Sequence, residues 1–190
     1  MERRILVRLL VAASAFAGPR VDASGTDDAA TRLKKAETEL GRDVITAEDR
    51  ARYSVDAARA ALGLGRFEVA GRHAAKALEA LQYSQRDWNY GNVVHRAHLV
   101  LGHVALSQGD TQRAVRELAL AGQTPGSPQL RTFGPNMSLA LALVLRGQKQ
   151  AVVDYLSMCG KFWENQDRLA EWTCDIESGR VPNFGSNLRY

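Results

Sequence analysis

Apolar residues return every three or four positions along most of this chain, which is the spacing of an α-helix with one buried face. Glycines interrupt the pattern, and one interruption recurs 44 residues further on, each time between two stretches with helical spacing. Helices paired across glycine turns are typical of a stack of helical hairpins. The two copies are Gly65-Arg66 followed by Ala70 and Ala74, and Gly109-Asp110 followed by Ala114 and Leu118.

The first half of the chain predicts three helices. Thr26 suits the N-cap of the first, which has a thin apolar stripe, ends at Gly41 and is polar enough to close one end of a stack. Thr46 caps the second, and the third covers residues 67–81. Their buried positions are mostly alanines, so these two helices can approach closely. A polar loop over residues 83–91 ends the unit.

The second hairpin has one apolar face over residues 94–105 and an answering face over residues 114–121. A loop rich in proline and glycine follows over residues 122–134, and Pro135 suits the first position of the next helix. That helix is apolar nearly all round, which predicts that neighbouring helices enclose it. Gly147 then turns the chain into a further helix.

A last helix is predicted over residues 166–178, ended by Gly179, and the tail after it is apolar enough to be extended and packed. We therefore predict an all-α fold, a right-handed α-solenoid of about three antiparallel hairpins with a C-terminal capping helix and an extended tail. The predicted divisions are a signal segment with the start of a linker (1–23), a polar N-terminal cap (24–46), the helical repeat domain (47–178) and the tail (179–190).

The first 23 residues have the order of a secretory signal. A charged start precedes an apolar run from Ile5 to Ala17, and the small residues that end this run suit cleavage before Gly18. The run is too short to span a bilayer. Because Arg8 is unusual in such a run, an amphipathic first helix or a wrongly assigned start is the alternative. We expect an exported chain, periplasmic or secreted, with no membrane span after cleavage.

The composition is that of a folded chain, with 45% hydrophobic and 24% charged residues over a length that suits one domain. Part of the formal net charge of +4 lies in the N-terminal arginines. No block of lysines and arginines with interleaved aromatics appears, so we do not expect nucleic acid as a partner.

The chain has two cysteines, Cys159 and Cys174, and neither belongs to a CxxC pair, so zinc and thioredoxin-type chemistry have no support. A turn at residues 164–167 would place them on nearly opposing positions of two antiparallel helices. In an exported chain they could then form a disulfide worth about 3 kcal/mol. Two buried free thiols that pack as small apolar residues are the equal alternative.

Residues 47–160 resemble the tetratricopeptide repeat family, whose pattern places Leu-Gly in the first helix and small residues at set steps in the second. The resemblance implies a stack of hairpins that binds a protein or peptide on its concave surface. The second hairpin matches at Leu101, Gly102, Ala114, Leu118 and Ala121, and the first more loosely at Ala57, Ala58, Ala70, Ala74 and Ala77. Segments 133–137 and 182–188 are similar to uncharacterised bacterial proteins, which implies no function.

Four cationic or titratable residues are expected on the concave side of the stack, because all lie on first helices of hairpins. Guanidinium groups fork to carboxylates with two hydrogen bonds, so this groove would favour an acidic peptide or a free C-terminus. A solvated basic face is the equal alternative. The four residues are Arg52, Arg59, Arg96 and His103.

Three histidines, His95, His98 and His103, lie on one predicted helix. His95 and His98 could share a face, but no acidic residue lies close by on that helix, so we expect packing roles and no metal or other cofactor. Among the aromatics, we favour packing over partner contact for Trp88 and Tyr90. Where the last two helices meet, we expect Phe162, Trp163 and Trp172 to be structural.

Catalytic motifs are lacking: the sequence has no GxSxG, no phosphate-binding glycine run and no HExxH. We therefore expect a non-enzymatic, exported scaffold that holds a protein or peptide, of acidic character, in the arginine-lined groove. The alternative is an accessory module of an envelope enzyme or assembly that docks through residues 133–190. An enzyme with a pocket between hairpins is a third hypothesis.

Overall fold

The computed structural model describes residues 23–188, with side chains from Asp28 onward. Over these residues the chain is helical and contains no strand, which confirms the predicted all-α class. The predicted signal segment lies outside the described residues, apart from Ala23. The helices are α1 (Ala23–Leu40), α2 (Ala47–Gly63), α3 (Phe67–Ala80), α4 (Tyr90–Ser107), α5 (Thr111–Gly122), α6 (Pro128–Phe133), α7 (Ser138–Val144), α8 (Lys149–Cys159) and α9 (Gln166–Glu177), with short 3₁₀ turns η1 (Leu81–Tyr83) and η2 (Gly185–Leu188).

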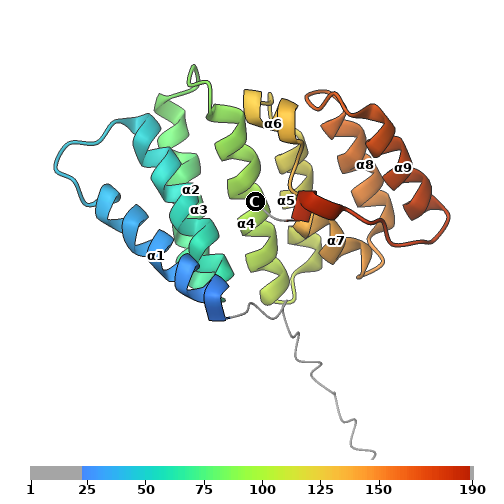
Figure 1. Ribbon diagram of the computed structural model, residues 1–190, viewed down its shortest axis with the longest axis horizontal. Helices are drawn as coiled ribbons and strands as arrows, with labels where there is room; N and C mark the ends of the chain where they lie inside the picture. Colours follow the sequence, from blue (N-terminus) through green and yellow to red (C-terminus); the bar gives the residue numbers. More distant parts are fainter. Residues whose placement is uncertain (1–22, 189–190) are drawn as a thin grey trace, which may run out of the picture.

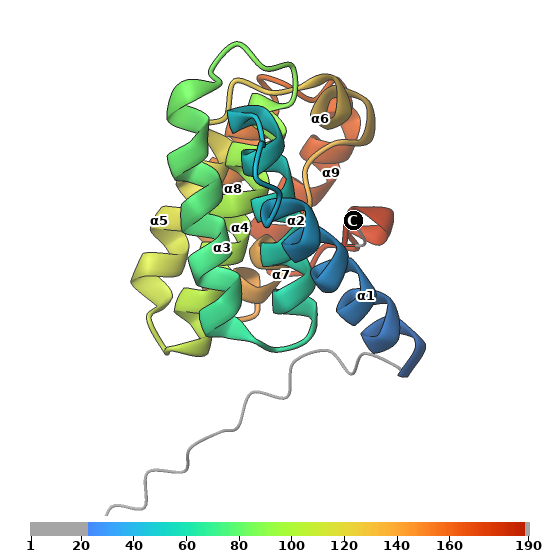
Figure 2. The ribbon, with the colours of Figure 1, turned by 90° about the vertical axis from the view of Figure 1, so that its left-hand side faces the viewer.

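The helices follow one another across the molecule in chain order, from α1 at one end to α9 at the other (Figure 1). Helix α2 packs against α1, α3 and α4, and α4 packs in turn against α5 and α7. Seen from the end, α3 and α5 lie on one side of the molecule, whereas α1, α6 and η2 lie on the other (Figure 2). The C-terminal segment therefore returns from α9 toward the middle of the stack.

Four helices end with the same glycine turn. After α2, α4, α7 and α9, a glycine adopts a positive φ, and the amide of the next residue donates to the carbonyl oxygen five positions earlier. This is the Schellman motif, which satisfies carbonyls that the helix end leaves over. The turns predicted at the first three positions are confirmed, as is the stop after α9. The glycines are Gly65, Gly109, Gly147 and Gly179, with φ values of 69°, 79°, 77° and 85°.

The first pair of helices is held by alanines. Small side chains let α2 and α3 approach closely, so six alanines in this pair are completely buried, as the sequence predicted. Helix α1 adds Leu33 and Ala36 to the same cluster, which extends to α4. The six residues are Ala57, Ala58, Ala61, Ala70, Ala74 and Ala77.

Helix α4 belongs to both apolar clusters of the protein. Val93, Ala97 and Val100 pack into the N-terminal cluster with α1–α3, whereas Leu99 and Leu106 pack into the C-terminal cluster with α5, α7, α8 and α9. A helix that is buried on opposite sides joins the two clusters into one structure. Further along α4, Gly102 lets α7 come close, because a Cβ atom at that position would collide with the side chain of Leu139.

Several predicted boundaries are wrong. Helix α1 begins at Ala23, so Thr26 lies within it and is not its N-cap. The loop predicted over 122–134 contains α6, in which Pro128 takes the early position that the sequence suggested for Pro135. Helix α7 is enclosed less completely than predicted, since Leu145 at its C-cap is 66% exposed.

The tail is packed, as predicted, but it is not extended to its end. Phe184 is buried in the C-terminal cluster, and the residues that follow it form η2. Trp172 explains this placement, because its indole nitrogen donates to the carbonyl oxygen of Asn183 at 3.1 Å. Its ring also meets Phe184 edge to face, with 4.9 Å between centroids.

The glycine turns predict a specific stability effect. Gly109→Ala should lower the free energy of unfolding by about 1–2 kcal/mol, because alanine is strained at positive φ. No atom lies within 4 Å of the added Cβ, so the effect comes from the backbone alone. Urea unfolding followed by circular dichroism measures it. Gly41→Ala is the matched control, since Gly41 has no positive φ; equal losses in both variants would contradict the explanation.

Candidate functional site

The residues predicted to line a groove lie on two helices that touch, Arg52 and Arg59 on α2 and Arg96 and His103 on α4. The face of α2 that carries the arginines is mixed in charge, however. Steps of three or four residues place acidic and basic side chains alternately on this face. In chain order the charged residues are Asp49, Arg52, Asp56 and Arg59.

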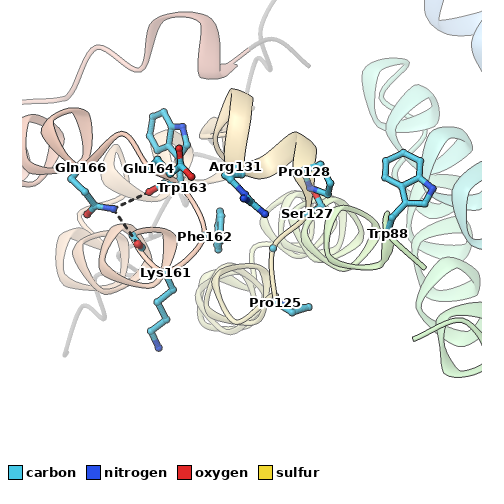
Figure 3. Close-up of a pocket in the computed structure, with 12 residues that line it drawn as sticks. Trp88, Pro125, Ser127, Pro128, Arg131, Lys161, Phe162, Trp163, Glu164 and Gln166 are labelled. Atoms are coloured by element: carbon cyan, nitrogen blue, oxygen red, sulfur yellow. Dashed lines mark hydrogen bonds between the residues drawn. The ribbon is translucent and has the colours of Figure 1, made fainter. Parts of the chain in front are cut away.

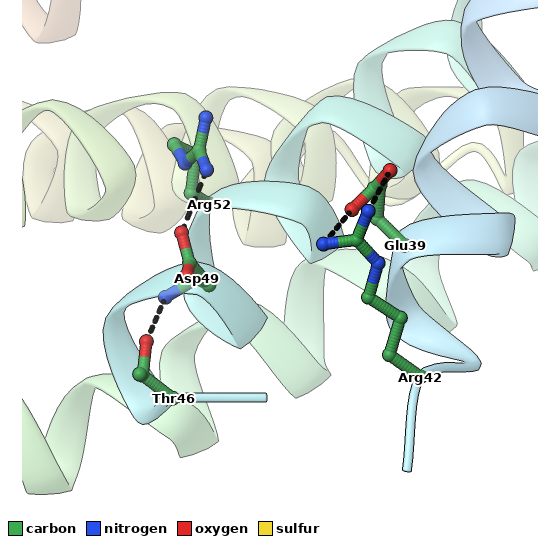
Figure 4. Close-up of polar contacts among 5 residues, drawn as sticks. All are labelled: Glu39, Arg42, Thr46, Asp49 and Arg52. Carbon is green, nitrogen blue, oxygen red and sulfur yellow. Dashed lines mark hydrogen bonds and ion pairs between the residues drawn. The ribbon is translucent and has the colours of Figure 1, made fainter. Parts of the chain in front are cut away.

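The charge of Arg52 is largely engaged within its own helix (Figure 4). Its guanidinium donates to the Asp49 carboxylate at 2.6 Å and lies 4.4 Å from the centroid of the Tyr53 ring. This hydrogen bond lowers the pKa of Asp49. The Asp49 amide in turn donates to the Thr46 hydroxyl at 3.1 Å, which caps α2. A ligand carboxylate would have to compete with Asp49 for Arg52.

His103 adds no positive charge at neutral pH, which is the second departure from the predicted groove. Its Nε2 atom lies 3.0 Å from the Ser138 hydroxyl oxygen, so it links α4 to the start of α7. Burial lowers the pKa of His103 to about 4, with a smaller effect from the nearby positive charge of Arg146. The predicted site therefore contains three arginines and one neutral imidazole.

His95 is a core histidine. Its Nδ1 atom lies 3.2 Å from the carbonyl oxygen of Ala121, and its Nε2 atom accepts the amide hydrogen of Asn136 at 3.3 Å. Nδ1 must therefore carry the proton, since Nε2 is occupied as an acceptor. The ring stacks on Tyr155, with 6.3 Å between centroids. Burial lowers the pKa of His95 to about 4. The imidazole thus joins α4, the end of α5 and the segment before α7.

The remaining polar groups on α4 and α5 are also internal. His98 Nδ1 lies 2.8 Å from Glu117 Oε2, so α4 and α5 are linked across their interface. The packing roles predicted for these histidines fit their contacts. Over residues 23–188, no cluster of histidine, cysteine, aspartate and glutamate side chains has the grouping of a metal site.

Cys159 and Cys174 are both free thiols, so the structure contains no disulfide between them. Cys159 is fully buried in the C-terminal cluster, where burial raises the pKa of its thiol. Cys174 is exposed on α9. The alternative of two buried thiols is therefore correct for Cys159 only.

A clamp joins two segments that are about 50 residues apart in sequence. The side-chain Nδ2 atom of Asn187 donates to the carbonyl oxygens of Phe133 and Pro135, at 3.2 and 2.9 Å. In return, the Met137 amide donates to the Asn187 carbonyl oxygen at 2.7 Å. These bonds fix the segment 133–137 between α6 and α7, from which Asn136 reaches His95.

The aromatic residues do not all pack as predicted. Trp163 and Trp172 are buried and stack with 5.5 Å between centroids, so their structural role is confirmed. Tyr90 packs against the N-terminal cluster, as predicted. Trp88 is 63% exposed, which contradicts the predicted packing role, and Phe133 at the end of α6 is 66% exposed.

Two adjoining hollows lie beside these exposed aromatics. The first, of about 500 Å³, lies between Trp88, the 125–128 turn and the connection from α8 to α9 (Figure 3). The second, of about 730 Å³, lies between α6, the start of α9 and η2. They form one surface, here named the C-terminal trough, because three residues line both. The shared residues are Arg131, Trp163 and Glu164.

The C-terminal trough has a positive balance of charge. Arg131 and Lys161 contribute cations, and Arg168 adds a third that is paired with Glu171 at 3.2 Å. Glu164 is the acidic residue among the lining side chains of the two hollows. The surface therefore offers uncompensated positive charge beside exposed aromatic rings.

Arg131 was not among the predicted site residues, because residues 122–134 were expected to form a loop. The signal that could have found it is Ser127-Pro128, a capping residue followed by the residue favoured at the first helical position. In the structure the Ser127 hydroxyl accepts the Leu130 amide hydrogen at 3.1 Å and starts α6. This short helix holds Arg131 over the trough.

No known protein family matches this chain, and no curated protein and no solved structure is significantly similar to it. The structure adds one general finding, that none of the helices within residues 23–188 is long and apolar enough to cross a membrane. The geometry of the molecule is therefore the basis for any functional conclusion.

The clamp implies that the Asn187 side chain contributes strongly to the stability of the fold. Asn187→Ala should lower the free energy of unfolding by about 1–3 kcal/mol, because one buried and one partly buried carbonyl oxygen lose their donor. Urea unfolding measures the loss. Asn183→Ala is the control, since this exposed side chain accepts a single local amide hydrogen and should cost less than about 0.5 kcal/mol. An equal loss in the two variants would refute the clamp.

The burial of His95 implies that the free energy of unfolding falls as the pH decreases. The unfolded histidine takes up a proton near its ordinary pKa of 6.5, whereas the folded one does so only near 4. The contribution of neutral His95 to the free energy of unfolding is therefore complete above pH 6.5 and is lost as the pH falls toward 4. His95→Gln should be less stable at pH 7, but its free energy of unfolding should fall by about 1–3 kcal/mol less between pH 7 and 4.5. An unchanged pH dependence would contradict this.

Proposed function

We propose that this protein is a non-enzymatic scaffold that binds another protein or a peptide, built as a divergent tetratricopeptide-like stack of helical hairpins. The recurrent glycine turns and the order of packing, α2 on α3 and α4 on α5, support this interpretation. The histidines of α4 support it as well, because both ring nitrogens of His95 and the Nε2 atom of His103 are used in internal contacts.

The C-terminal trough is the contact surface that the geometry favours, and it joins parts of the segment 133–190 with Trp88 and Arg131, which lie outside that segment. The observation that carries this proposal is the joining of two hollows at Arg131 and Trp163, with exposed Trp88 beside one and Phe133 beside the other. Tryptophan, other aromatics and arginine are enriched among the residues that dominate binding at protein interfaces.

The trough is also held in shape before any partner binds. The Asn187 clamp fixes the segment after α6. On the opposite wall, the Gln166 side chain donates to the carbonyl oxygens of Gly160 and Trp163, at 3.1 and 2.9 Å, and closes the connection from α8 to α9. A preformed surface loses less conformational entropy on binding, which favours affinity.

The arginine-lined groove on α2 and α4 is the second candidate surface. What favours it is that Arg59 and Arg96 are both half-buried on helices in direct contact. The pairing of Arg52 with Asp49 and the neutrality of His103 weaken its preference for acidic ligands.

The proposed location is outside the cytoplasm, in the periplasm or in the medium. The support is the order of charged, apolar and small residues in the first 23 positions. Export would also place the exposed thiol of Cys174 in an oxidising environment.

Capture from an envelope extract compares the two surfaces directly. Tagged full-length chain should retain a specific set of proteins, and Trp88→Ala with Phe133→Ala should reduce their recovery at least ten-fold, because truncation of aromatic anchors removes most of an interface's affinity. Arg52→Ala with Arg59→Ala is the matched double variant and should change recovery less than two-fold. Quantitative mass spectrometry measures recovery, and circular dichroism checks that both variants are folded.

Two other outcomes have definite meanings. Loss of capture in the arginine variant alone would transfer the function to the groove on α2 and α4. Equal recovery with the wild type and with both variants would contradict binding through either surface.

A further inference from the structure

We propose that Arg131 seats a carboxylate side chain from an extended acidic segment of the partner, with apolar residues of that segment lying toward Trp88 and Phe133. This inference rests on the proposed function and adds the chemical class of ligand. Carboxylates are the natural partner of a guanidinium, which binds them through two parallel hydrogen bonds.

The position of Arg131 fits this role. It is exposed on α6, and Figure 3 shows its guanidinium directed into the first hollow, between Phe162 and the turn at Ser127-Pro128. The floor beneath it is tightly packed, since a Cβ on Gly126 would lie only 2.7 Å from the Cβ of Phe162. A side chain of the partner that binds Arg131 would therefore also contact a rigid apolar surface.

The positive charges of Arg131 and Lys161 outnumber the one carboxylate, Glu164, that lines the same hollows. Some arginines elsewhere on the surface are paired with a nearby carboxylate, such as Arg72 with Glu68 at 2.5 Å and Arg180 with Asp175 at 2.8 Å, whereas others, such as Arg50, have no such pair among the described residues. Within residues 23–188, no hydrogen bond, ion pair or ring contact engages the side chains of Arg131 and Lys161. A partner's carboxylates would supply the missing counter-charge.

The shape of the trough indicates an extended ligand. Two hollows meet at Arg131, and exposed aromatic rings lie at separate places along them, Trp88 by the first and Phe133 by the second. Their lining is polar as well as aromatic and includes the backbone of the 125–128 turn. An extended chain can place an acidic residue at Arg131 and an apolar residue on either side, whereas a compact small molecule would fill one hollow only.

Fluorescence anisotropy tests the inference with two probe peptides and the full-length chain. The acidic probe is fluorescein-Ser-Pro-Phe-Glu-Ser-Glu-Phe-Pro-Ser, and the neutral probe has glutamine in place of each glutamate. The acidic probe should bind at least ten-fold more tightly than the neutral one. Arg131→Gln should remove most of this difference, because a neutral side chain cannot form the charge-assisted pair.

The matched control is Arg50→Gln, an exposed arginine on α2 that lines neither hollow, which should leave both affinities within two-fold of the wild type. Trp88→Ala should weaken both probes equally. If the two probes bind equally well and Trp88→Ala weakens both, the trough binds peptides without a carboxylate seat, and the inference fails while the proposed function stands. If the acidic probe does not bind, or binds Arg131→Gln as tightly as the wild type, the inference is refuted, and the capture experiment decides the proposed function separately.

Discussion

The structure depends on the burial of α4 between two apolar clusters. One set of its side chains completes the alanine-rich packing of α1–α3, and the opposite set packs with α5, α7, α8 and α9. A polar residue in such a helix destabilises the fold unless its hydrogen bonds are satisfied. His95 meets this requirement because its two ring nitrogens contact the Ala121 carbonyl and the Asn136 amide. The same side chain thus positions the segment that leads to the C-terminal trough.

The trough in turn depends on contacts between distant parts of the chain. Segment 133–137 is held from one side by His95 and from the other by Asn187, and Gly134 lies against Trp163 so closely that a Cβ would collide with the indole. Trp163 stacks on Trp172, which holds the tail through Asn183. Segments 133–137 and 182–188 are thus parts of one structural unit.

The sequence predicted what local chemistry determines. Glycines at positive φ, capping residues and apolar periodicity depend on neighbours within a few positions, and the turns at Gly65, Gly109 and Gly147 were found for this reason. The boundaries near Pro135 were wrong because proline suits a helix start and a loop equally, and the clamp that selects the loop comes from Asn187. Residue spacing could not reveal it.

The candidate site was predicted less well. Whether a charged side chain can bind a ligand depends on the groups it already contacts within the fold, and residue spacing alone does not show these contacts. Arg52 was placed correctly on its helix, but Asp49 three residues earlier engages it. His103 was grouped with the arginines of the groove, yet its enclosure beside α7 keeps it neutral. Trp88 was assigned to packing, although it is exposed. The most direct test of the account is native-state hydrogen exchange by NMR of the amides in α4 and of Asn136. We predict that both exchange only through global unfolding, with one free energy. Asn136 exchanging through a smaller, local opening while α4 stays protected would contradict the role given to His95 and α4.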